Sequence, residues 1–188
     1  MRERIIVLYA ATLTMVGLLT GWAPKAYGVP VQWSGNGHYY ERFDRLHDYD
    51  QITWLEAKVV AESQSYLGAQ GYLATITSQE ENDFIINNLG GEAIRGKWFG
   101  GFETSEGVWN WVTGEPWSYT NWDWDQPDNF YQTLDGLNFH WRGTLGVWDD
   151  HPLTREISGY IVEYPVPEPA TILLLGLGGL TILRRRGS

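Results

Sequence analysis

Apolar residues in the first half of the chain recur at helical spacing in two segments. Thr53 stands three residues before Glu56, the spacing of a capping box, and apolar residues follow at helical intervals as far as Leu67. A second capping sequence, Ser-Gln-Glu-Glu, begins at Ser78, and its apolar face ends at Leu89 before two glycines. The pattern therefore predicts two capped helices.

Short aromatic runs between Gly, Asn, Asp and Pro dominate the rest of the chain, and they are typical of strands. These runs lie at 72–76, 98–101, 108–112, 137–141, 146–148 and 159–164. No helix is predicted beyond Trp98. Between Val112 and Leu137 lies a long stretch without clear secondary structure, and loops of that length in a compact domain are usually functional. The sequence predicts an α+β domain with one long loop.

The N-terminal residues have the pattern of a processing signal, which indicates that they are not part of this domain. Arg2 and Arg4 precede a short apolar stretch, and small residues, Ala26 and Gly28, stand where a signal peptidase requires them. We expect a signal peptide over residues 1–28, removed before Val29. An uncleaved N-terminal anchor is the alternative.

The C-terminal residues combine a Pro-Glu-Pro motif at 167–169, an apolar run and three arginines at 184–186. The run from 170 to 183 is shorter than the roughly 20 residues that span a bilayer comfortably. Residues 166–188 closely resemble the PEP-CTERM sorting signal. The resemblance implies export by a Gram-negative bacterium that makes exopolysaccharide, transient membrane association, and cleavage by an exosortase, which leaves the domain outside the cell. A plain tail anchor is the alternative.

Composition narrows the function of the remaining domain, residues 29–165. The whole chain has 188 residues and a formal net charge of −10, and the domain alone has seven basic against 21 acidic residues. No basic stripe is available for nucleic acid. With no cysteine, the chain has no disulfides, thiol catalysis or Cys-ligated metal. The four histidines show no metal-ligand spacing, and no acid–base group indicates an enzyme.

Two short segments concentrate oxygen ligands. The sequence Asp-Gln-Pro-Asp-Asn occupies residues 125–129 of the long loop, and Trp148 is followed by two aspartates. Carboxylate and amide oxygens suit a hard cation such as Ca²⁺. Loops are also rich in Asn and Asp simply because these residues form turns. Composition alone leaves both interpretations open.

The order of the elements resembles the C-type lectin-like fold over about residues 35–165. Two capped helices are followed by Trp-Phe-Gly-Gly at 98–101, Gly-Val-Trp-Asn-Trp-Val at 107–112, Gln-Pro-Asp at 126–128 and Trp-Asp-Asp at 148–150. Each falls where the family has its own motif. The resemblance implies two helices plus antiparallel strands around a long loop region, here without the usual disulfides, because the family's four cysteines fall on Ala61, Gly136, Leu153 and Val162.

The resemblance also implies the ligands of one calcium ion, which a bound sugar coordinates through two hydroxyls. Position by position, these ligands are Gln126, Asp128, Asp149 and Asp150, and Pro127 would follow a cis peptide bond. The Gln-Pro-Asp form is associated with galactose-type hydroxyl geometry. Candidates for stacking on a sugar ring are Trp122, Trp124, Tyr131 and Trp141, with Trp124 included in the expected carbohydrate site.

Two departures from the family pattern weaken the expected site. A carboxylate expected before Asp135 is replaced by Leu134, so either Asp135 or Gln132 substitutes or the site is one ligand short. Asp149 stands where Asn is usual, and it lacks the amide donor that would bind a sugar hydroxyl.

The expected function is calcium-dependent carbohydrate binding without catalysis, by a protein exported to the cell surface or exopolysaccharide matrix. The alternative is a lectin-like structural or protein-binding domain with a degenerate calcium site.

Overall fold

The computed structural model describes residues 25–26, 28–45 and 51–166. Most of the predicted signal peptide and nearly all of the predicted sorting tail lie outside these residues. Lys25 and Ala26 fall inside the predicted signal peptide and pair with Asp44 and Phe43. No helix within the described residues is long and apolar enough to cross a membrane.

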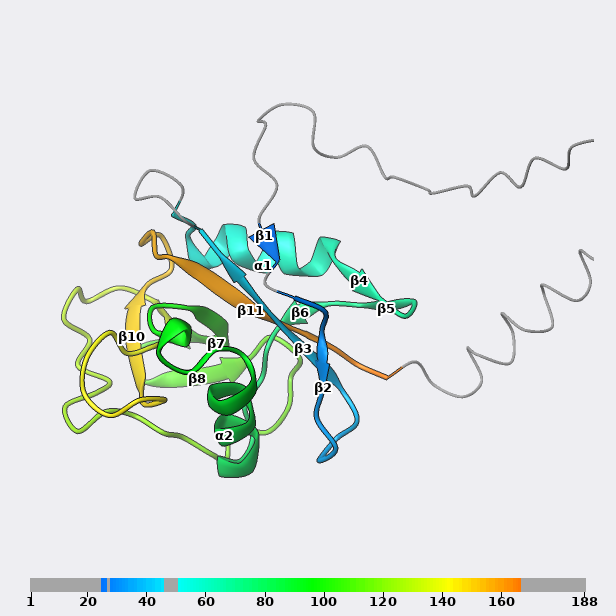
Figure 1. The fold of residues 1–188 in the computed structure, drawn as a ribbon. Helices are drawn as coiled ribbons and strands as arrows, with labels where there is room; N and C mark the ends of the chain where they lie inside the picture. Colours follow the sequence, from blue (N-terminus) through cyan, green and yellow to red (C-terminus); the bar gives the residue numbers. More distant parts are fainter. Residues whose placement is uncertain (1–24, 27, 46–50, 167–188) are drawn as a thin grey trace, which may run out of the picture.

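One mostly antiparallel sheet lies at the centre of the described residues, and two helices pack against it (Figure 1). Its main path runs β1 (Lys25–Ala26), β3 (Tyr39–Asp44), β11 (Gly159–Tyr164), β7 (Trp98–Ser105), β9 (Asp135–Phe139) and β10 (Trp148–Pro152). Alongside this path, β2 (Val31–Gln32) pairs with β3, β6 (Tyr72–Leu73) with β11, and β8 (Val108–Trp111) with β7. Only the β11–β7 pairing is parallel among these. The fold is the predicted α+β class.

The two predicted helices form, but both differ from the sequence prediction in detail. Helix α1 (Trp54–Ser63) has the complete capping box of Thr53 and Glu56. It stops earlier than predicted, because the next residues form the hairpin of β4 (Ser65–Tyr66) and β5 (Ala69–Gln70). Helix α2 (Gln79–Asn88) has Ser78 as its N-cap residue, and the Ser78 hydroxyl accepts from Glu81 N. The short 3-10 helix η1 (Gly91–Ile94) was not predicted.

Strand β11 divides the core into two clusters, because neighbouring residues of a strand face opposite sides of a sheet. Ile161 belongs to a cluster with Ile85 of α2, whereas Tyr160 and Val162 belong to a cluster with Ala57 of α1. Figure 1 shows the same arrangement, with α1 and α2 on opposite sides of β3 and β11. Each helix therefore covers one face of the central strands.

The positions that replace the family's cysteines pack as neighbours. A β-carbon added to Gly136 would lie 3.1 Å from the Leu153 side chain. Ala61 and Val162 are both fully buried in the α1 cluster, and both border Gly71. These contacts agree with the expected correspondence and show small or apolar residues filling the space that the resemblance assigns to cystines.

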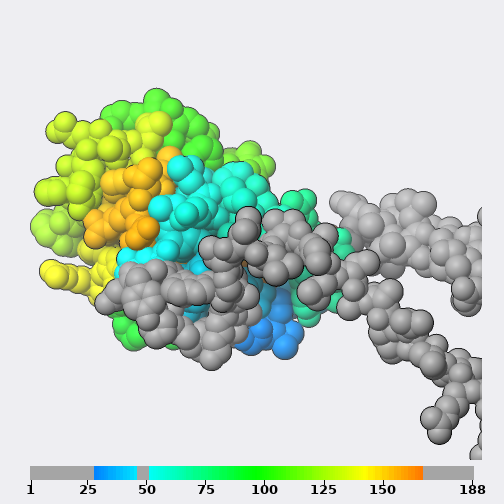
Figure 2. Space-filling view, turned by 90° about the horizontal axis from the view of Figure 1, so that it is seen from above, coloured from blue at the N-terminus to red at the C-terminus, as the bar shows by residue number. Residues whose placement is uncertain are grey.

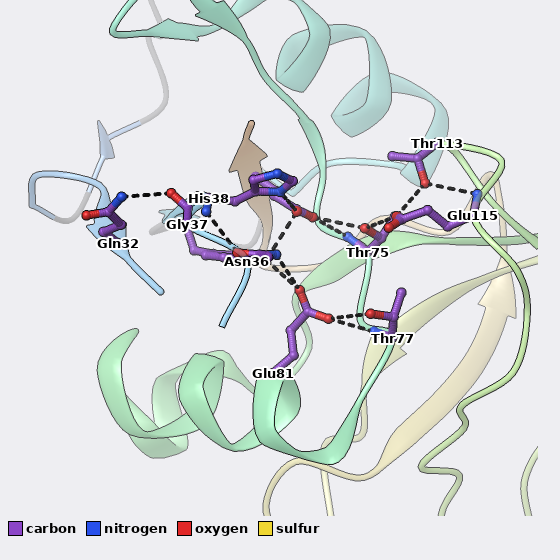
Figure 3. A network of polar contacts seen from close by, with 11 residues as sticks. Gln32, Asn36, Gly37, His38, Thr75, Thr77, Glu81, Thr113 and Glu115 are labelled. Atoms are coloured by element: carbon purple, nitrogen blue, oxygen red, sulfur yellow. Dashed lines mark hydrogen bonds and ion pairs between the residues drawn. The ribbon is translucent and has the colours of Figure 1, made fainter. Parts of the chain in front are cut away.

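A buried polar network joins the β2–β3 turn to α2 and β11 (Figure 3). The hydroxyl of Tyr40 donates to Glu81 at 2.5 Å and lies 3.1 Å from Glu163 Oε1, and His38 Nδ1 lies 2.6 Å from the same Glu163 oxygen. Glu163 also accepts from the backbone and hydroxyl of Thr75. Glu81 and Glu163 are buried, so each needs these donors to offset lost hydration.

This network predicts that the free energy of unfolding falls as pH rises above about 4.5. Burial raises the pKa of Glu81 above its ordinary 4.5, so its contribution is complete below 4.5 and is lost as pH rises through the folded-state pKa. The hydrogen bond to Glu163 raises the pKa of His38 above 6.5, so its contribution is lost only above 6.5. Urea unfolding of wild type and Glu81→Gln across pH measures the contribution of Glu81, which is the difference between the two curves of unfolding free energy against pH. Parallel curves would contradict a pH-dependent contribution from Glu81.

Candidate functional site

The long loop and strand β10 carry the predicted oxygen ligands. Residues 112–134 form no helix or strand, so the predicted long loop is present, although β9 begins at Asp135, two residues before the predicted strand. Backbone bonds tie the loop to β10, from Trp148 N to Asn121 O and from Asp123 N to Trp148 O. Figure 2 shows the yellow-green loop surface at one end of the molecule, next to the orange residues of β10 and β11. The peptide bond between Gln126 and Pro127 is cis, as expected.

The four predicted calcium ligands meet at a small cavity of about 220 Å³, called here the site cavity. Its lining consists of Gln126, Asp128, Phe130, Tyr131, His140, Asp149, Asp150 and His151. Asp149 and Asp150 are each only 5% exposed, whereas Asp128 is exposed. Segments that lie more than 20 residues apart in the sequence thus supply one set of oxygen donors.

Asp150 fixes the cis-proline turn by hydrogen bonds from the loop backbone. Its two carboxylate oxygens accept from Asp128 N at 3.2 Å and Asn129 N at 3.1 Å. Asp128 Oδ1 in turn accepts from Phe130 N, and Gln126 Oε1 accepts from Asp128 N. Burial raises the pKa of Asp150, and the charge of Asp128 raises it further, against the lowering effect of these backbone bonds.

Asp149 faces two of the histidines that show no metal-ligand spacing in the sequence. Its Oδ2 lies 3.4 Å from His151 Nε2 and 3.7 Å from His140 Nε2, and Asp123 holds the other side of His140 at 2.6 Å. Burial raises the pKa of Asp149 to about 6 and lowers that of His151 to about 4. His151 is therefore neutral at pH 7, and one of its ring nitrogens is a hydrogen-bond donor.

Asp135 does not line the site cavity. It is 1% exposed and accepts from the hydroxyl of Thr133 at 2.7 Å. Burial, followed by the charges of Asp150 and Glu103, raises its pKa to about 6. Asp135 thus lies behind Asp150 and adds negative charge there without reaching the cavity, while Leu134 beside it is 44% exposed.

The aromatic candidates for stacking on a sugar ring differ in burial and in whether they line the site cavity. Trp122 packs its ring on Trp109 at 5.0 Å and belongs to the aromatic layer over the core. Trp124 is 90% exposed but lines no part of the cavity. Tyr131 does line it, together with Phe130, which is 74% exposed and was missed although it stands two residues after Asp128.

The oxygen donors of the site cavity are of the kind that a hard cation prefers, but they are not already arranged around one point. Three carboxylates and one amide oxygen border the cavity, and two of the carboxylates are buried with little positive charge to balance them. Within the described residues, no three His, Asp or Glu side chains converge closely enough to hold a metal ion. Each carboxylate oxygen has two lone pairs, so Asp150 can keep its backbone donors and still bind a cation.

Comparison with known families identifies the fold. The family model described as "Lectin C-type domain" matches residues 50–152, which is more than half of the chain. The chain belongs to the C-type lectin family. Residues 165–186 match a second model, the PEP-CTERM protein-sorting motif, which implies export.

Curated relatives include proteins of very different size. The chain is 32% identical over 145 residues to halomucin of Haloquadratum walsbyi, covering 69% of this chain and 1% of halomucin. It is 29% identical over 126 residues to asialoglycoprotein receptor 2 of Rattus norvegicus, and the match covers 65% of this chain and 38% of the receptor. Lectin BRA-3 of Megabalanus rosa is 28% identical over 87% of this chain and 94% of its own length. The chain spans less than half the length of the first two.

Solved structures agree on the fold. The C-type lectin CEL-I from Cucumaria echinata has a TM-score of 0.59 and 25% identity, covering 75% of this chain and all of CEL-I. A calcium-independent type II antifreeze protein has a TM-score of 0.54 and 21% identity, covering 73% of this chain and 96% of its own. The same fold thus occurs in a protein that its description calls a lectin and in one that it calls calcium-independent. The fold alone therefore does not determine the function, which depends on the residues of the site.

Proposed function

We propose that this protein is a calcium-dependent carbohydrate-binding protein, exported to the cell surface or the exopolysaccharide matrix, with no catalytic activity. The convergence of Gln126, Asp128, Asp149 and Asp150 on one cavity is the observation that carries the proposal. The sorting motif and the lectin relatives support it. Relatives with this fold are generally binding proteins.

The cation would be held by these four side chains. When bound, it supplies a charge that a pair of sugar hydroxyls can coordinate. The protein supplies orientation, because Asp150 accepts from the loop backbone at Asp128 and Asn129 and so fixes the turn that presents Asp128. Asp135 holds negative charge behind Asp150, which favours cation binding without occupying a ligand position.

The sugar would meet two further groups of the cavity. Phe130 and Tyr131 pack edge to face, with centroids 5.0 Å apart, and present exposed rings on which the apolar face of a sugar can stack. His151 places its Nε2 beside Asp149, and an N–H there can donate where the usual asparagine amide is missing. The Gln-Pro-Asp sequence supports galactose-type ligands.

A structural or protein-binding domain with a degenerate cation site is the second candidate. The observations in its favour are Leu134 at the position of an expected carboxylate and the absence of a closed cage among the described side chains. The two candidates differ in one measurable property, the response to calcium.

Calcium titration distinguishes them. With a dissociation constant of about 10⁻⁴ to 10⁻³ M, typical of extracellular sites, calcium at ~10 mM should raise the free energy of unfolding by about 1–3 kcal/mol. Asp150→Asn should abolish most of this gain, whereas Asp149→Asn, which restores the family's usual oxygen donor, should keep it. Binding of a galactoside should disappear with a chelator. No calcium-dependent shift in wild type would favour the structural candidate.

A further inference from the structure

A second, larger depression adjoins the site cavity and contains basic side chains. This depression, called here the outer groove, has a volume of about 450 Å³ and shares Tyr131, His140, Asp149 and His151 with the site cavity. Its remaining lining residues are Trp141, Arg142 and Arg155. A sugar held at the site cavity would therefore extend its substituents into the outer groove.

The arginines of the outer groove are unusual in this acidic domain because no carboxylate of the described residues forms an ion pair with them. Elsewhere in the described residues, Arg42 and Lys97 pair with Asp44, Lys58 with Glu62, and Arg95 with Glu92. Among residues 28–45 and 51–166, neither Arg142 nor Arg155 forms an ion pair. Two uncompensated guanidinium groups thus border one groove.

Hydrogen bonds hold both arginines in position, through the side chain of Arg155 and through the backbone of Arg142. Arg155 donates to the hydroxyl of Tyr131 at 2.8 Å and lies over its ring at 5.8 Å, which uses one of its five N–H groups. Arg95 donates to the carbonyl oxygens of Arg142 and Gly143 at 3.1 and 3.2 Å, which fixes the turn that carries Arg142. The guanidinium donors are accordingly available to a ligand.

We propose that the outer groove is a subsite for an anionic substituent of the bound glycan, which makes acidic sugars such as uronates the preferred ligand class. The proposal rests on the proposed function, because the site cavity positions the sugar. A planar guanidinium matches the two oxygens of a carboxylate. The half-exposed ring of Trp141 offers a stacking surface beside them. Asp149, the acidic residue of the groove, has its carboxylate turned toward two histidines and the proposed cation.

The test compares methyl galactoside, the matching methyl galacturonide, and the methyl ester of that galacturonide, in saturating calcium. These probes share the hydroxyls that would meet the cation and differ only at C6. Wild type should bind the acid about 3- to 10-fold more tightly than its ester, the range expected for two partly exposed ion pairs. Raising the salt concentration should reduce this preference. A 6-sulfated galactoside shows whether the groove favours a carboxylate or a sulfate.

Variants assign the preference to the groove. Arg142→Ala and Arg155→Gln together should remove the preference for the acid, and because the glutamine amide can still donate to Tyr131, the affinity for the neutral galactoside should stay within about twofold. Lys58→Ala, which removes one positive charge from α1, should change neither value. If the neutral probes bind but the acid gains nothing, the subsite is refuted and the proposed function stands. If no probe binds in calcium, both are refuted.

Discussion

Replacing Trp148 with alanine is expected to lower the free energy of unfolding by about 3–5 kcal/mol, a large share of the stability of a single domain. The Trp148 side chain is fully buried, and its ring packs against Phe99 at 5.2 Å and Tyr119 at 5.4 Å. Its Nε1 donates to Asn82 Oδ1 at 2.9 Å, so truncation also leaves a buried acceptor without its donor. Urea unfolding measures the loss.

The same substitution should weaken calcium binding, because Trp148 connects the core to the site. Its backbone pairs with the long loop, and Asp149 and Asp150 follow it directly in β10. Trp124→Ala is the matched control. Trp124 is 90% exposed, so its loss should change stability by less than about 0.5 kcal/mol. Equal destabilisation by the two variants would contradict the packing described for Trp148.

The local sequence predicted those elements whose pattern is set by neighbouring residues. Both helix starts were predicted from capping residues, and β11 has the predicted bounds, because a continuous run of aromatic and β-branched residues marks it. Strand β3 was missed. Its Glu41 and Arg42 are buried, and Glu41 accepts from Tyr164, more than 120 residues away. No local pattern reveals a strand whose charged residues are satisfied by a partner so distant in sequence.

In the site, too, the residues within local motifs were predicted, and those that depend on distant strand pairing were not. The oxygen ligands follow from two motifs, and the structure brings all four to one cavity. His140 and His151 were not recognised, because only the register of β9 against β10, which sets Asp149 opposite Asn138, places both histidines beside Asp149 on one face of the sheet. Asp135 was considered as a ligand because it stands near the expected position. The structure places it inside the protein, a direction that depends on the strand register and that the motif alone does not fix.

The position of Leu134 gives the strongest test of the cation site by gain of function. Introducing a carboxylate there, as Leu134→Glu, is expected to tighten calcium binding by roughly tenfold or more, because the affinity of such sites rises with the number of charged ligands. Leu134 is 44% exposed and immediately precedes β9, so the longer side chain meets no packing cost. Its backbone oxygen accepts from Leu153 N in either variant.

Leu134→Gln provides the matched control, since glutamine has the length of glutamate without its charge. The calcium concentration at half of the maximal shift in melting temperature should fall for the glutamate variant and stay near the wild-type value for the glutamine variant. The added negative charge should make the calcium-free glutamate variant slightly less stable, because three carboxylates already border the cavity. An unchanged midpoint in the glutamate variant would mean that residue 134 does not reach the cation. The correspondence between this loop and that of calcium-binding relatives would then be wrong at this position.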